Sequence, residues 1–352
     1  MKGFFVFAVL CMLVLFCLFG QQTMSYALEG YRLFITAVFP ALFPFLVLVN
    51  CLNRLSSKGT KAKKGILTLL RIFAVSSLSG TPAGSLMIES TFGPSDNERK
   101  LKSSILSAPL NLCCPLFLIG TVSGEMLRLG ANAVYLLLIS HYASALILTL
   151  TLGTICSKSK YKPDSFPQEI ETPSNNDRGL ADVFTVSVYS AMQTMLRICG
   201  TLVFCFTVVK LVDYSGALSF LHPAVSSAIL GLLEMTSGIK ALSQLSITPI
   251  LKLCLISFLS SFGGVSVLLQ VCSAVQTDPA AYFCGKLLHG FLAAFLCFLL
   301  FPLFPVSEAV FSQQINAVFY RFVSFSEIVL VFAISVSASM LLTIGAIRRT
   351  RT

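Results

Sequence analysis

Charged residues are scarce in this chain. Only 11% of its 352 residues are Asp, Glu, Lys or Arg, whereas 55% are hydrophobic and the mean hydropathy is +0.85. A soluble domain carries roughly 25% charged residues. The composition therefore excludes a soluble globular protein and predicts an integral membrane protein.

The chain also has few of the residues and motifs that build metal sites or catalytic centres. It contains three His, and its 12 Cys form no CxxC pair, so neither a metal site nor a disulfide framework is expected. Cys residues scattered through apolar helices usually act as small hydrophobic residues. No nucleophile elbow, P-loop, HExxH motif or paired intramembrane Asp motif occurs. We therefore expect a protein that is not an enzyme and that has no cofactor.

The net charge of +10 comes from Lys and Arg residues that gather between apolar segments. Such clusters are typical of the cytoplasmic loops of membrane proteins. We therefore expect the lipid bilayer, and not nucleic acid, to be the surrounding partner.

Apolar segments near or above the ~20 residues that cross a bilayer recur along the whole chain. They lack the ten-residue alternation of a β-barrel, which predicts an all-α fold. The first one lacks a good small-x-small cleavage site, so we expect a retained helix and not a secretory signal. The segments cover residues 3–20, 30–52, 66–90, 104–124, 132–156, 183–212, 224–246, 250–274, 282–304 and 323–347.

The positions of the basic clusters predict the topology. The clusters lie at 54–64, 99–102, 158–178 and 348–351. If every segment crossed the membrane, the middle two clusters would face the outside, against the positive-inside tendency. If 66–90 and 224–246 are re-entrant hairpins, all four clusters and both termini are cytoplasmic, and Lys286 also falls on that side. This scheme gives about eight transmembrane helices plus two re-entrant hairpins.

The same scheme divides the chain into two inverted repeats. Segment 30–52 crosses from the outside to the inside of the membrane, and its counterpart 183–212 crosses from the inside to the outside. Each is followed by a hairpin, a centrally broken helix and a full-length helix. The expected units are an N-terminal helix, a first repeat, a cytoplasmic linker, a second repeat, and a C-terminal helix with a basic tail. They span residues 1–29, 30–156, 157–182, 183–304 and 305–352.

Small and polar residues interrupt four of the apolar segments. Lipid cannot satisfy the backbone groups that such a break exposes, so broken helices occur where they line a cavity. Breaks at matching positions of two halves indicate the binding site of a transporter. The break residues that we expect to bind substrate are Ser79, Gly80, Thr81 and Gly84, then Asn111, then Glu234, Thr236, Ser237 and Gly238, and finally Ser261, Gly263, Gly264, Ser266 and Gln270.

Charged residues within the segments are further candidates. Glu234 could bind a coupling cation, carry a proton or cap the second half of its hairpin. Arg197 could attract an anionic substrate or pair with Glu234, and Lys240 is a weaker candidate that could snorkel to the surface. The half-helix N-termini near the break glycines would suit an anion. For His141 and His289 we favour packing roles, and a coupling ion, H⁺ or Na⁺, is left open.

Several of these motifs resemble the sporulation integral membrane proteins of the YlbJ type. The matching stretches cover 30–304: Ser79-Gly80-x-Pro82-x-Gly84, residues 115–122, residues 137–142, residues 231–238 and residues 261–270. That family is similar to proteins with nucleoside-recognition Gate domains and, through them, to concentrative nucleoside transporters. The resemblance implies a fold of this kind.

The resemblance also implies a role in endospore formation, namely moving dipicolinic acid from the mother cell across the outer forespore membrane. Dipicolinate is a small aromatic dianion, which suits helix N-termini and Arg197. The alternatives are a carrier of nucleosides or another small metabolite, and a non-transporting scaffold for sporulation membrane partners. Homo-oligomerisation stays open as well.

Overall fold

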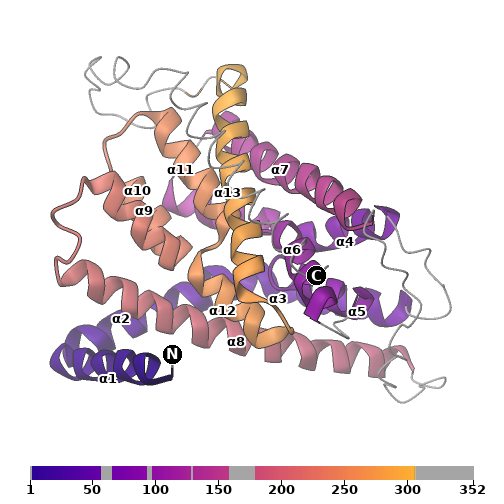
Figure 1. Cartoon of the computed structure of the whole chain (residues 1–352), viewed down its shortest axis with the longest axis horizontal. Helices are drawn as coiled ribbons and strands as arrows, with labels where there is room; N and C mark the ends of the chain where they lie inside the picture. The colour runs from indigo at the N-terminus through magenta and orange to yellow at the C-terminus, as the bar shows by residue number, and fades with distance from the viewer. Residues whose placement is uncertain are drawn as a thin grey trace.

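The computed structural model describes residues 2–56, 66–92, 97–127, 130–157, 179–304 and 306, and the regular structure in these ranges is entirely helical (Figure 1). The expected helix 323–347 and nearly all of the linker 157–182 lie outside the described residues. The all-α prediction agrees with the part of the chain that the structure describes.

The first half begins with two helices at one edge of the molecule and continues through a hairpin into a broken helix (Figure 1). The apolar run that was expected to start at residue 30 starts at Gly20. It includes a short π-helical turn, η1, which apolar periodicity does not reveal. The elements are α1 (Lys2–Leu18), α2 (Gly20–Leu33), η1 (Phe34–Val38), α3 (Phe39–Ser56), α4 (Ile66–Ser79), α5 (Ala83–Phe92), α6 (Asn97–Leu110), π-helical η2 (Phe117–Met126) and α7 (Ala131–Ser157).

The second half repeats this order of parts. One long helix leads into a hairpin, a helix broken in the middle and a full-length helix. The elements are α8 (Leu180–Tyr214), α9 (Pro223–Leu233), α10 (Met235–Ser243), α11 (Pro249–Phe262), α12 (Gly264–Ala274), α13 (Pro279–Leu300) and the 3₁₀ turn η3 (Phe301–Leu303).

Five of the described helical stretches are long and apolar enough to cross a membrane, by length and composition. They correspond to five of the eight expected spans: Gly20–Leu52, Ala131–Cys156, Leu180–Tyr214, Pro249–Ala274 and Pro279–Leu303. Segment 3–20 corresponds to α1, which is 17 residues long. The expected span 104–124 is divided between α6 and η2. The protein is therefore a polytopic helical membrane protein, whereas the full number of spans and the inversion of the repeats stay predictions.

The packing joins the two halves. Helix α13 stands in the middle of the molecule, where it contacts α11, α7 and α6, while α8 runs along one edge against α2 and α3 (Figure 1). One hydrophobic core combines residues of both halves, for example Leu42 and Phe117 with Met195, Ile239 and Leu259. Helices α6 and α7 of the first half therefore contact α13 of the second, which brings the helix breaks of the two halves together.

Candidate functional site

All four helix breaks meet at one cavity. It leaves about 60 Å³ for the centres of water-sized spheres, which is room for several water molecules. Each break contributes to its wall, and so do η1, α3, η2 and α8. The lining residues are Val38, Leu42, Gly80, Thr81, Leu112, Cys113, Cys114, Phe117, Ile198, Leu202, Glu234, Met235, Thr236, Gly263, Ser266, Val267 and Gln270.

The second hairpin turns at a single extended residue, Glu234, between α9 and α10. So tight a turn requires the two helices to approach closely. A Cβ atom on Gly238 would lie 2.1 Å from the Cα atom of Gly231, so only glycine fits at this crossing. Gly238 is therefore a packing residue that holds the hairpin closed, and it does not line the cavity.

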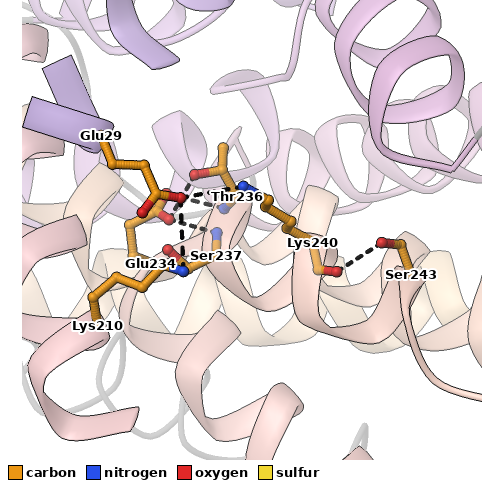
Figure 2. Close-up of polar contacts among 7 residues, drawn as sticks. All are labelled: Glu29, Lys210, Glu234, Thr236, Ser237, Lys240 and Ser243. Atoms are coloured by element: carbon orange, nitrogen blue, oxygen red, sulfur yellow. Dashed lines mark hydrogen bonds and ion pairs between the residues drawn. The ribbon is translucent and has the colours of Figure 1, made fainter. Parts of the chain in front are cut away.

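The Glu234 carboxylate caps the start of α10. It accepts hydrogen bonds from the backbone N–H of Thr236 (3.0 Å), the hydroxyl of Thr236 (2.6 Å) and the backbone N–H of Ser237 (2.6 Å), as Figure 2 shows. Glu234 is only 2% exposed. A negative charge on free N–H groups at a helix N-terminus is favourable, so the capping role expected for this residue is what the geometry provides.

Helix α12 begins differently. Gly263, just before the helix, and Gly264, its first residue, have φ angles of +85° and +81°, and no described side chain caps this N-terminus. Ser266 and Gln270 follow one turn apart and line the cavity. They are 3% and 7% exposed, and neither side chain makes a hydrogen bond within the described part of the chain. This wall therefore offers an uncapped helix N-terminus beside two buried polar groups without partners.

The first-half hairpin is closed by Asn111. Its Oδ1 accepts a hydrogen bond from the backbone N–H of Ser85 (3.1 Å), near the start of α5, and its Nδ2 donates to the Ser85 hydroxyl and to the Tyr282 hydroxyl (3.2 Å for the latter). Asn111 is 1% exposed and lies behind the cavity, since the wall begins at Leu112. Asn111 therefore caps α5, as Glu234 caps α10.

Side chains of α7 form hydrogen bonds with the backbone at the second break, in the first half of the chain. The backbone N–H of Cys113 donates to His141 Nε2 (3.2 Å), and the Tyr142 hydroxyl donates to the Cys113 carbonyl (2.8 Å). Nδ1 of His141 lies 2.8 Å from the Ser261 hydroxyl, so this imidazole connects the breaks of the two halves. His141 therefore holds two breaks together, beyond the simple packing role that was expected.

The structure places the expected site residues in two groups. Seven of them line the cavity: Gly80, Thr81, Glu234, Thr236, Gly263, Ser266 and Gln270. Others support the breaks from behind without lining it: Ser79, Gly84, Asn111, Ser237, Gly238, Ser261 and Gly264.

Neither expected cation reaches the cavity wall. Arg197 is exposed on α8, whereas its neighbour Ile198 lines the cavity, and within the described residues Arg197 forms no ion pair with Glu234. Lys240 is exposed, and its Nζ lies 3.2 Å from a Glu29 carboxylate oxygen that Lys210 also approaches, at 3.7 Å (Figure 2). Of the two roles left open for Arg197, pairing with Glu234 is therefore not seen among the described residues, where Arg197 is exposed and Glu234 is buried.

Sequence reasoning missed the apolar wall and one buried cation. Apolar residues such as Leu42, Phe117 and Leu202 face the cavity, but in sequence they look like lipid-facing residues. Lys286, which was placed with the cytoplasmic basic residues, is 2% exposed on α13, and its Nζ donates to the Asn111 carbonyl (2.8 Å). Its position within an apolar segment is the signal that could have singled it out.

The chain is similar to the sporulation integral membrane protein YlbJ of Bacillus subtilis (strain 168). The two are 25% identical over 325 residues, which cover 81% of this chain and 79% of the relative. This similarity confirms the resemblance to YlbJ-type proteins that the break motifs indicate. No family model matches the chain. No solved structure matches it either.

Proposed function

We propose that this protein is a membrane transporter that binds a small anionic aromatic molecule, dipicolinic acid, and carries it from the mother cell across the outer forespore membrane. The observation that carries this proposal is the meeting of four helix breaks, two from each half, at one cavity. Irregular backbone is tolerated at membrane depth when it is buried in protein or lines a cavity. Transporters bind their substrates at such paired breaks.

The wall that α12 provides suits an anion. An uncapped helix N-terminus presents free N–H groups and a partial positive charge. The Ser266 hydroxyl and the Gln270 amide lie on the same face and have hydrogen bonds to donate. The Glu234 carboxylate repels a bound anion less than a carboxylate without hydrogen bonds would, because Thr236 and Ser237 already donate hydrogen bonds to its oxygens.

The apolar part of the cavity wall suits an aromatic ring. Leu42, Phe117 and Leu202 present apolar side chains to the cavity. Ligand sites typically combine an apolar lining with a few polar groups that fix the orientation of the ligand. A ring that carries carboxylates, with its ring on the apolar wall and a carboxylate at α12, fits both walls.

The cellular setting of the proposal comes from the relative. YlbJ is named a sporulation integral membrane protein. Similarity over most of both chains supports a role of this chain in endospore formation. We propose the outer forespore membrane as its location, and we propose cytoplasmic termini because the basic clusters follow the positive-inside tendency.

Uptake into vesicles tests the proposed function. We expect purified protein in liposomes to take up labelled dipicolinate with saturation, whereas protein-free liposomes do not. Excess unlabelled dipicolinate should compete, and excess nucleoside should not. Uptake of labelled nucleoside but not of labelled dipicolinate would assign the cavity to the alternative substrate class, and absence of uptake of both would favour a scaffold.

A further inference from the structure

Lys286 is a buried cation directly behind the cavity. It lies on α13, is 2% exposed, and donates to the carbonyl of Asn111 (2.8 Å). The next residue along the chain, Leu112, lines the cavity. The peptide group between Asn111 and Leu112 therefore links the Lys286 amine to the cavity wall.

Within the described residues, no carboxylate forms an ion pair with Lys286. The titratable groups that face it are Cys113 at the second break, His141 on α7 and His289 on α13 itself. The two imidazoles lie against each other with ring centroids 5.2 Å apart, and Nδ1 of His289 is buried without a hydrogen-bond partner. Lys286 and the two His residues therefore form a buried polar cluster with no paired carboxylate among the described residues.

Burying an ammonium ion without a carboxylate partner is energetically costly. Two changes remove this cost: the amine loses its proton, or an anion arrives nearby. The hydrogen bond to the Asn111 carbonyl survives either change, because a neutral amine also donates N–H. An empty cavity therefore favours the neutral amine, and a cavity that holds an anion favours the ammonium ion.

We propose that Lys286 is the proton-carrying group of the cavity. It takes up one proton from solvent onto the Nζ lone pair when an anion binds, and it releases this proton when the anion leaves. Because coupling between two binding events is reciprocal, the proton strengthens anion binding as much as the anion strengthens proton binding. The inference rests on the proposed function, and it makes transport of the anion proton-coupled.

Proton uptake during ligand binding tests this inference. Dipicolinate is added to purified protein in weakly buffered, mildly alkaline solution that contains a pH-indicator dye, and anion binding and proton uptake are measured together. We expect close to one proton per bound dipicolinate for the unmodified protein. Lys286→Met should bind about tenfold more weakly or worse and take up almost no proton.

Two further variants keep the test decisive. Lys286→Arg keeps a permanent charge, so it should bind dipicolinate without proton uptake even if the methionine variant fails to fold. Lys252→Met removes another buried lysine, 4% exposed on α11 and outside the cavity wall, and should behave like the unmodified protein. Proton uptake by Lys286→Arg equal to that of the unmodified protein would overturn the inference. Absence of dipicolinate binding by the unmodified protein would instead overturn the proposed function, and this inference with it.

Discussion

At the helix breaks, single side chains form hydrogen bonds with backbone groups that no longer have a partner within a helix. Glu234 caps α10, Asn111 caps α5 and His141 binds the backbone of Cys113. An unpaired backbone group in the membrane interior costs several kcal/mol, so these side chains are needed for the breaks to exist at all. Among the described helices that begin at these breaks, α12 starts without a side-chain cap, and its first turn lines the cavity.

We predict that Glu234→Ala destabilises the protein, because it removes three hydrogen bonds to the start of α10. Loss of an N-cap typically costs about 0.5–2 kcal/mol. The melting temperature in detergent should fall, and Glu234→Gln, which keeps an oxygen acceptor, should lose less. Equal melting temperatures for the alanine variant and the unmodified protein would show that the cap does not hold the hairpin.

At the scale of elements, the hairpin α9–α10 depends on a glycine crossing. A methyl group on Gly238 would overlap the backbone of Gly231, at 2.1 Å from its Cα atom and 2.5 Å from its N atom. Backbone cannot move aside as a flexible side chain can, so the two helices would have to separate. The position of Glu234 and Thr236 in the cavity wall depends on this crossing.

We predict that Gly238→Ala lowers the melting temperature strongly, because overpacked cores typically lose about 1–3 kcal/mol of stability and occasionally more. Gly200→Ala is the matched control. Gly200 is exposed on α8 with nothing within 4 Å of an added Cβ atom, so the change should be neutral or slightly stabilising. A Gly238→Ala protein as stable as the control would contradict the close crossing.

The sequence predicts the helices and their breaks better than it predicts the tight turn and the π-helical turns between them. Glycine, proline and polar residues inside apolar runs placed all four breaks, because such residues stand out against an apolar background. The single-residue turn at Glu234 was not predictable, since it depends on how closely Gly231 and Gly238 pack. The π-helical turns η1 and η2 were missed because hydrophobic periodicity over five or ten residues does not distinguish them from α-helix.

At the scale of the whole molecule, the two halves form one site. Helix α13 of the second half binds the second break of the first half through Tyr282 and Lys286, and His141 of the first half binds Ser261 of the second. These contacts join residues more than 100 positions apart, and no pattern along the sequence specifies them. For the same reason Arg197 was expected in the site and Lys286 was not.

The central claim is that a small anion binds where the four breaks meet, against the α12 wall. Equilibrium binding of labelled dipicolinate to purified protein tests it most directly, with Ser266→Ala/Gln270→Leu as the site variant and Ser273→Ala as the control on the same helix. Ser273 donates to the Gln270 carbonyl and does not line the cavity.

We predict saturable binding to the unmodified protein and to Ser273→Ala. The double variant should bind at least about tenfold more weakly, about 1.4 kcal/mol, because it loses two hydrogen-bonding groups. Its melting temperature should hardly change, since neither side chain has a partner within the described part of the chain. Binding of equal strength by the double variant and the control would contradict the account.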